Sequence, residues 1–456
     1  MDQANAGDTV WDRGHRVLTI GLILTVSMAA FENLAVATIL PATVADIGGL
    51  PLYGWTFSAF MLAEIIAISI AGRAGDRHGL ARPFAVGGAL FCTGLVSGGL
   101  AASMPILIAS RALQGLGGGA IAVLAYAATA RGYAEGARPR MLALISTAWV
   151  VPGLIGPALA GAIAEHASWR WVFLGLAPLS AVAVALAVRA LRNVGPSPDA
   201  TAHGATGAAV GLAAGAAALL CAPGLDFAAA AVALGAVAAI VAAASLRRLT
   251  PPGTLRARPG LPAAVAAMGL LSAAFFGAEV FIPLALTEVR SRPVTIAGLA
   301  LTAATITWTT GAWLQARLVP RRSRRVLVAV GLLVMAVGIA GVSAVLLPAV
   351  PAVVAPIAWG VAGLGMGLAY STTALVVLES APRGEEGAAS AAMQLTNVLG
   401  TALGTGVGGV VLARVTAAGG SIAAAIAFTD AIALLAAAGA AATALRLPSA
   451  APSDSC

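Results

Sequence analysis

Five ionisable residues stand inside long apolar runs of the sequence: Glu32, Glu64, Arg111, Glu279 and Asp430. An ionisable group in an apolar environment is costly, so it usually faces a cavity or a partner and marks a functional path. Burial also disfavours the charged form of a carboxyl group, which can bring its protonation into the physiological range of pH. The chemistry that these residue types offer is therefore the binding and release of protons and cations.

The composition sets the environment in which these groups must be positioned. Of the 456 residues, 60% are hydrophobic and only 10% are charged, whereas a soluble globular protein carries about 25% charged residues. The formal net charge of +8 could suggest a nucleic-acid partner. However, the basic residues are all arginines in short gaps between apolar runs, and they form no single basic face. The sequence therefore predicts an all-α polytopic membrane protein that lies in a lipid bilayer and binds no nucleic acid.

A membrane-spanning helix takes about 20 residues, and fourteen apolar windows are of about this length. They lie near residues 17–40, 52–72, 84–102, 105–130, 140–164, 171–189, 205–223, 226–245, 261–286, 294–316, 326–347, 351–378, 387–413 and 421–445. Fourteen spans leave about 12 residues for each connection, too few for a soluble catalytic domain. Four histidines and three cysteines form no pattern of an acid–base cluster, a metal site or a disulfide framework. We therefore expect no enzymatic activity, no cofactor and no metal.

The seventh and eighth windows decide between twelve and fourteen spans. Residues 205–245 contain a single charge, Asp226, between their two halves. A nearly uncharged loop of this length is unusual in water, so we expect a hairpin of two spans joined at Asp226. The predicted organisation is a six-helix bundle in residues 14–193, an inserted two-helix hairpin in 204–246 and a second six-helix bundle in 259–447.

The placement of arginines predicts the orientation, because short cytoplasmic loops carry an excess of basic residues. With the N-terminus inside, 21 arginines fall in inner segments. Four fall in outer segments, namely Arg170, Arg290, Arg292 and Arg414. We therefore expect both termini to be cytoplasmic, and the arginine split is the same for twelve spans as for fourteen.

The chain also contains an internal repeat, a frequent property of transporters. Residues 111–119 and 359–367 share the pattern Gly-Leu-Gly-x-Gly, and each segment lies in the fourth span of its half. In the fifth spans, Gly161 corresponds to Gly409, and the arginine-rich segment 72–83 pairs with 311–325. The repeat supports two related six-helix halves.

The segment between the second and third windows carries the sharpest local motif. It reads Gly72-Arg73-Ala74-Gly75-Asp76-Arg77-His78-Gly79-Leu80-Ala81-Arg82. It resembles the signature Gly-x-x-x-Asp-Arg-x-Gly-Arg-Arg of the major facilitator superfamily, with Arg82 in place of the basic residue that is usual at Leu80 and Ala81. Asp76 can accept charge-assisted hydrogen bonds from arginines, which would hold the two bundles together on the cytoplasmic side. Gly72 permits close helix approach and Gly79 a tight turn.

Further segments resemble motifs of the same family. Residues 111–119 resemble its fourth-span motif, and residues 169–173 match its Trp-Arg-Trp-x-Phe motif before the sixth span. Glu32 stands nine residues before Pro41, where 14-span drug:proton antiporters usually carry an aspartate. The resemblance to this branch of bacterial multidrug exporters implies a major facilitator fold with two six-helix bundles and 14 transmembrane helices.

The fifth window contains a motif that the family associates with antiporters. Gly153, Gly156, Pro157 and Gly161 resemble this motif, with Ala160 in place of one of its glycines. These small residues favour close packing of the two halves, and the resemblance implies antiport.

Glu32 is the candidate for the proton site. A carboxyl group that must lose its proton before a cationic substrate binds would move the two in opposite directions. Glu279 follows Phe275 by four residues and Phe276 by three, so the three share one helix face. An acid beside aromatic rings suits an amphipathic cation, and a core-lining aromatic pair with an incidental acid is the alternative.

The remaining polar candidates have two possible roles each. The resemblance implies a coupling role for Arg111, and a structural tether to backbone carbonyls is the alternative. Glu64 and Asp430 could line the cavity or serve packing. Gln394 and Asn397 share one face of the thirteenth span, where they could line the substrate cavity or join helices by polar contacts.

The sequence thus predicts a monomeric, proton-coupled antiporter that exports hydrophobic or cationic drugs by alternating access. Its small-molecule substrate and protons are the expected partners. The bias toward Ala, Gly and Arg without Lys suggests a GC-rich bacterial genome, and hence a bacterial cytoplasmic membrane. The same fold could instead export an endogenous lipid, siderophore or secondary metabolite, and a non-transporting receptor or scaffold is a third interpretation.

Overall fold

The computed structural model describes residues 10–12, 15–134, 137–192, 194–195, 206–225, 227–382 and 385–448. Asp226 and the predicted boundary residues 14, 193 and 204 lie outside these ranges. The described residues form helices and no strands, so the prediction of an all-α membrane fold is confirmed.

The helices follow one another in three sets along the chain. The first set is α1 (Arg16–Ile47), α2 (Trp55–His78), α3 (Ala81–Gly99), α4 (Met104–Gly132), α5 (Arg138–Thr147), α6 (Val150–His166) and α7 (Arg170–Leu191). The second set is α8 (Thr206–Cys221) and α9 (Ala228–Leu249). The third set is α10 (Leu261–Glu279), α11 (Ile282–Leu284), the π-helix η4 (Ala285–Val289), α12 (Val294–Leu318), α13 (Arg324–Ala344), α14 (Val354–Glu379), α15 (Glu386–Ala417) and α16 (Ile422–Ala444). Short 3-10 turns lie at Leu50–Leu52, Ala222–Gly224 and Thr254–Arg256.

Twelve of the fourteen predicted spans each coincide with one α-helix of this order, whereas the fifth, residues 140–164, covers both α5 and α6, and the ninth, residues 261–286, covers α10, α11 and the start of η4. Twelve helical segments in the described part of the chain are long and apolar enough to cross a membrane, and both α8 and α9 are among them. The other two are α3, with 19 residues, and α6, with 17 residues, which follows closely on α5. The fifth predicted span is therefore a broken helix.

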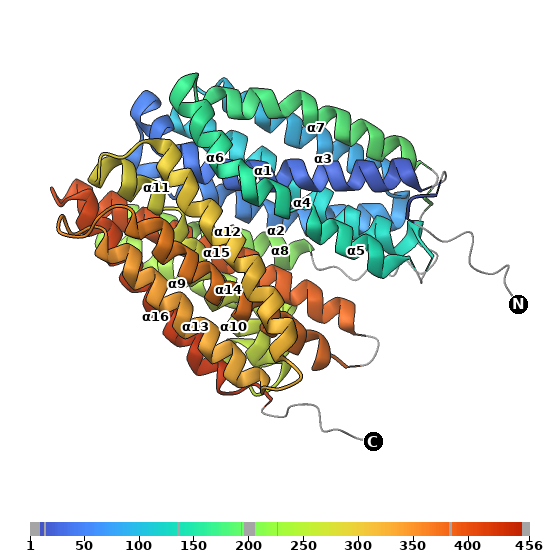
Figure 1. The fold of residues 1–456 in the computed structure, drawn as a ribbon. Helices are drawn as coiled ribbons and strands as arrows, with labels where there is room; N and C mark the ends of the chain where they lie inside the picture. The colour runs from blue at the N-terminus through green and yellow to red at the C-terminus, as the bar shows by residue number, and fades with distance from the viewer. Residues whose placement is uncertain are drawn as a thin grey trace, which may run out of the picture.

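Figure 1 shows α1 to α7 as one group of helices and α10 to α16 as a second group. We call them the first and the second group. They converge at the end where α11 lies and diverge toward the end where α5 lies (Figure 1). The hydrogen bonds that join the two groups within the described residues lie at the converging end. Tyr53 Oη donates to the Val280 carbonyl at 3.0 Å and Ser58 Oγ to the Ala402 carbonyl at 2.9 Å.

Small residues set the spacing of the helices within each group. In the first group, a Cβ on Gly115 would lie 2.1 Å from the Phe60 carbonyl oxygen of α2, so α4 and α2 meet backbone to backbone. In the second group, a Cβ on Gly363 would lie 2.3 Å from the Ala304 carbonyl oxygen of α12. The two copies of the Gly-Leu-Gly-x-Gly motif therefore make matching contacts in the two groups.

The hairpin of α8 and α9 lies beside the seam between α2 and α15. Leu212 and Ala216 of α8 belong to a buried apolar cluster with Ile65 of α2 and Leu399 of α15. Helix α9 packs on α8 through small residues, because a Cβ on Gly215 would lie 2.8 Å from the backbone nitrogen of Ala242. Helix α8 therefore contacts both groups.

Candidate functional site

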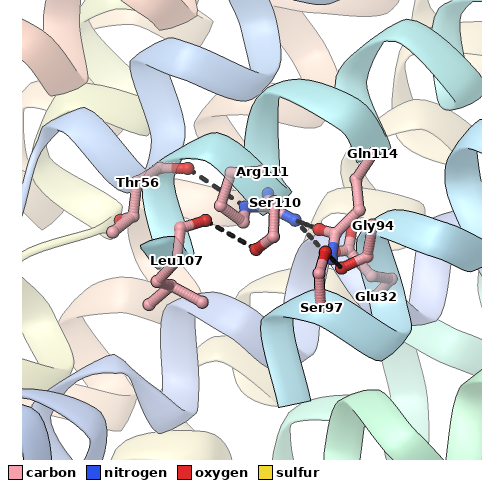
Figure 2. A network of polar contacts seen from close by, with 8 residues as sticks. All are labelled: Glu32, Thr56, Gly94, Ser97, Leu107, Ser110, Arg111 and Gln114. Atoms are coloured by element: carbon pink, nitrogen blue, oxygen red, sulfur yellow. Dashed lines mark hydrogen bonds and ion pairs between the residues drawn. The ribbon is translucent and has the colours of Figure 1, made fainter. Parts of the chain in front are cut away.

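Glu32 of α1 and Arg111 of α4 form a fully buried ion pair. Their side chains are 1% and 0% exposed, and Nη1 of Arg111 donates to Oε1 of Glu32. Figure 2 shows this pair at the centre of a polar network that α1, α2, α3 and α4 build together. The sequence predicted both residues as functional but gave no indication that they contact each other.

The surrounding network holds the guanidinium in a fixed place. Nε of Arg111 donates to the Thr56 carbonyl at 3.0 Å, and Nη1 also donates to Oε1 of Gln114. The Gln114 amide nitrogen in turn donates to the Gly94 carbonyl of α3 at 2.9 Å. The ring of Phe60 covers the guanidinium, with its centroid 4.4 Å from the guanidinium carbon. Arg111 is thus held by a carbonyl, an amide and an aromatic face in addition to Glu32.

Two atoms of the pair remain without a hydrogen-bond partner. They are Oε2 of Glu32 and Nη2 of Arg111, and both are buried. A buried charge is costly unless it is paired, so the arrangement depends on the mutual neutralisation of the two residues. A carboxylate with one free oxygen can still accept a proton there. Protonation would cancel its attraction for Arg111, which would then keep its charge without a counterion.

The second group contains a cluster of aromatic rings on α10, α12 and α14. Phe275 of α10 stacks on Trp359 of α14, with ring centroids 4.7 Å apart, and contacts Phe276 and Trp308 edge to face at 5.3 and 5.5 Å. The Tyr370 ring of α14 lies 5.5 Å from Trp308. We call Phe275, Phe276, Trp308, Trp359 and Tyr370 the aromatic site. Sequence reasoning found only the two phenylalanines.

Glu279 lies at the edge of the aromatic site. It is the last residue of α10, it is 8% exposed, and it follows Phe275 by one helical turn. It therefore stands on the same side of the molecule as the rings, as its spacing from Phe275 predicts.

The remaining predicted polar residues do not join these two sites. Asp430 of α16 is buried and accepts a hydrogen bond from Ser343 Oγ of α13 at 2.8 Å. Asn397 of α15 accepts one from Ser272 Oγ of α10 at 2.6 Å, which is the helix-joining role. Glu64 of α2 and Gln394 of α15 are half-buried.

Most of the predicted gate motif, residues 72–82, is helical and does not form a loop. Helix α2 continues to His78, α3 begins at Ala81, and Gly79 turns the chain between them with φ +77°, a left-handed conformation that favours glycine. A Cβ on Gly72 would make only ordinary contact with Cγ2 of Val123, at 3.7 Å, so this glycine is not needed for close helix approach. Arg77 and Arg82 are exposed.

Asp76 pairs with Arg131, a residue that the sequence did not single out. Arg131 Nη2 donates to Asp76 Oδ1, and Nη1 donates to the Gly75 carbonyl at 3.1 Å. Because Arg131 belongs to α4, this ion pair joins α2 to α4 inside the first group. In this conformation it does not connect the two groups, which differs from the predicted latch.

The Asp76–Arg131 pair predicts a small effect on stability. The two side chains are 44% and 22% exposed, and such a pair contributes at most about 1 kcal/mol. We expect the Asp76→Asn variant to unfold within about 1 kcal/mol of the wild type in a thermal or denaturant titration. A larger loss of stability would contradict the assignment of this pair as solvent-screened.

The glycines of the predicted antiporter motif pack α6 on its neighbours. A Cβ on Gly153 would lie 2.2 Å from Cγ2 of Thr305, and one on Gly161 would lie 3.0 Å from Cα of Thr295. A Cβ on Gly156 would instead lie 3.4 Å from Cδ2 of Phe31 of α1, and one on Gly298 of α12 would lie 2.3 Å from the Pro157 carbonyl oxygen. The motif therefore forms a second close seam between the two groups.

Helices of membrane-spanning length in two groups, with a buried ion pair in the first and a cluster of aromatic rings in the second, are typical of the class of polytopic membrane transporters. A family model described as Major Facilitator Superfamily matches residues 22–405. The chain belongs to the major facilitator superfamily.

Relatives and solved structures agree with this membership. A probable multidrug-efflux transporter of Mycobacterium tuberculosis is 31% identical over 446 residues, which cover 93% of each chain. An auto-inhibited peptide transporter of the POT family matches with a TM-score of 0.70 at 16% identity, over 96% of this chain and 99% of that one. A D-xylose–proton symporter matches with a TM-score of 0.66 at 15% identity, over 95% and 98%. At these identities the two structures show the fold alone.

Proposed function

We propose that the chain is a proton-coupled antiporter that exports hydrophobic or cationic drugs across a bacterial cytoplasmic membrane. The observation that carries the proposal is the fully buried Glu32–Arg111 pair with its free carboxylate oxygen. Membership in a transporter family and the 31% identity with a probable multidrug-efflux transporter support the choice of cargo.

The proposed cycle depends on the mutual neutralisation of Glu32 and Arg111. With Glu32 ionised, the pair holds α1 against α4. When Glu32 binds a proton, Arg111 is left charged without a counterion, and the packing of α1 and α4 becomes less favourable. Helix α1 also contacts α11 and α12 of the second group, so a shift of α1 would reach the seam between the groups. Binding of a cation then favours release of the proton, which makes the two flows opposite.

Within this proposal the two groups are the two bundles that rock about the substrate. The predicted division places the hairpin of α8 and α9 between them in sequence. The arginine distribution supports a cytoplasmic location for the diverging end, where α1 begins and α16 ends (Figure 1). The structure then corresponds to a conformation whose outer end is closed.

Transport in purified liposomes tests the proposal. Protein reconstituted with an imposed pH gradient should drive uptake of a cationic dye, and added dye should dissipate the gradient. Liposomes without protein, and liposomes treated with a proton ionophore, serve as controls. Dye movement without any proton counter-flow would overturn the antiport assignment.

A further inference from the structure

A cavity of about 530 Å³ lies against the C-terminal part of α7. Among the described residues, those that line it are Ala185, Val188, Arg189 and Arg192. These positions are spaced i, i+3, i+4 and i+7, so they share one face of the helix. The cavity has no lining residue in common with the buried ion pair or with the aromatic site.

Another face of α7 packs against the first group. Ala183, Ala187 and Leu191 are 1%, 0% and 0% exposed. A Cβ on Gly21 of α1 would lie 2.6 Å from the backbone nitrogen of Ala187, so α7 and α1 meet backbone to backbone. Figure 1 shows α7 at the outer edge of this group. Because α7 is also long and apolar enough to cross a membrane, the cavity lies on a surface that meets lipid.

An apolar track leads along the cavity face of α7 to the two arginines. Val182, three residues before Ala185, is 59% exposed, and Ala185 is exposed as well. From Val182 to Arg192 the helix rises about 15 Å, which is about half of the roughly 30 Å thickness of the hydrocarbon core of a bilayer. The face therefore has the depth of one lipid leaflet, with apolar side chains along it and two cations at its end.

The two arginines are available to a ligand. Within the described residues, neither Arg189 nor Arg192 forms an ion pair or a hydrogen bond, and no acid lines the cavity. Helical residues three apart are neighbours, so both guanidinium groups can reach one phosphate, which guanidinium binds through paired hydrogen bonds. Two cations without an acid repel an ammonium group. They therefore favour a phosphate whose head group is negative overall.

We propose that this face of α7 binds an anionic phospholipid, with its phosphate held by Arg189 and Arg192 and an acyl chain along Val182 and Ala185. This inference does not rest on the proposed export function. Both features of the face are needed, because the cations alone suit any phosphate and the apolar track alone suits any lipid. In the orientation that the arginine distribution supports, the lipid belongs to the cytoplasmic leaflet.

Quenching of a fluorophore by brominated lipids tests this inference at one position. In a background in which the three cysteines are replaced by alanine, Val182→Cys carries a bimane, and the protein is placed in phosphatidylcholine nanodiscs. Brominated phosphatidylglycerol and brominated phosphatidylcholine are compared as quenchers at equal mole fraction. We expect the anionic lipid to be preferred beside this probe by about tenfold.

The end of α9 supplies a matched control. Arg247 and Arg248 are also exposed arginines at the end of a membrane helix, but they do not line the cavity. Val241 stands seven residues before Arg248, as Val182 stands before Arg189. A bimane on Val241→Cys should report a preference of less than about threefold. Equal preferences at the two probes would show a general attraction of basic helix ends for anionic lipid, and the site on α7 would be wrong.

Two double variants test the arginines themselves at the Val182 probe. Arg189→Gln with Arg192→Gln should reduce the preference for phosphatidylglycerol to less than about twofold. Arg247→Gln with Arg248→Gln removes the same formal charge and should leave the preference unchanged. Thermal unfolding confirms that both variants are folded. A preference that survives the first double variant would overturn the inference.

Inorganic phosphate distinguishes a lipid from a free anion. Added phosphate should leave the preference for phosphatidylglycerol as it is in chloride at the same ionic strength, because free phosphate gains nothing from the apolar track. If phosphate abolishes the preference and chloride does not, the arginines bind a free anion and the lipid assignment is wrong.

Discussion

Replacing Glu32 by glutamine is expected to reduce gradient-driven dye transport to less than about a hundredth of the wild-type rate, because a carboxamide cannot carry the proton. The side chain keeps its size and an oxygen that can still accept from Arg111. The variant should therefore still bind dye and exchange it across the membrane without a gradient. Transport with an imposed pH gradient and dye exchange without one are measured on the same proteoliposomes.

The loss of charge at Glu32 also has a cost in stability that must be separated from the loss of coupling. Removing one partner of a buried ion pair typically costs about 3–5 kcal/mol, because the other charge stays buried. The double variant Glu32→Gln with Arg111→Gln removes both charges and should recover stability relative to either single variant, with no recovery of coupled transport. A double-mutant cycle on the free energy of unfolding measures this difference.

Asp430→Asn is the matched control for Glu32→Gln. Asp430 is also a buried acid in a membrane helix, but its partner is the hydroxyl of Ser343 and not a cation. We expect Asp430→Asn to retain coupled transport. If it loses coupling while Glu32→Gln keeps it, the proton site lies on α16 and the Glu32 assignment is wrong.

The helices could be predicted from the sequence because a membrane-spanning helix pairs its backbone groups internally and presents apolar side chains to an apolar medium. Each such helix therefore appears in the sequence as a long apolar window. The same reasoning found Glu32 and Arg111, since isolated charges in such windows stand out. Their pairing was not predictable, because residues 32 and 111 meet only through the packing of α1 against α4.

The aromatic site was largely missed for a related physical reason. Trp308, Trp359 and Tyr370 are aromatic residues in apolar helices, and core packing is the common role of such residues. One signal was available, since Trp359 occupies the repeat position of Arg111. A repeat that puts tryptophan where its copy has a buried arginine indicates a difference in chemistry and not only in packing.

The second large effect on transport is expected at the contact that closes the converging end. A Cβ on Gly409 of α15 would lie 2.6 Å from Cα of Gly54, and a Cβ on Gly54 would lie 2.6 Å from the Thr405 carbonyl oxygen. Both atoms that the added Cβ would meet, Gly54 Cα and the Thr405 carbonyl oxygen, belong to the backbone. The clash can therefore not be relieved by the movement of a side chain. We expect Gly409→Leu to separate α15 from the start of α2 and to reduce transport by roughly tenfold or more, because overpacking costs about 1–3 kcal/mol.

Labelling of Ser58→Cys measures this opening directly. Ser58 is 0% exposed and donates to the Ala402 carbonyl at 2.9 Å, so a cysteine there is protected while the converging end is closed. In a background with Cys92, Cys221 and Cys456 replaced by alanine, a membrane-impermeant maleimide should label it faster once Gly409→Leu is added. Thermal unfolding should stay cooperative, since the helix contacts within each group are unchanged.

Gly175→Leu is the control for adding a side chain to a helical glycine. A Cβ at Gly175 of α7 meets nothing within 4 Å, so this variant should transport normally and leave Ser58→Cys protected. If Gly409→Leu also transports normally with Ser58→Cys unlabelled, then the glycine contact does not hold the converging end closed. If both leucine variants increase labelling equally, the cause is general loosening of the helices. Only a selective effect at Gly409 supports closure of the two groups through this pair of backbones.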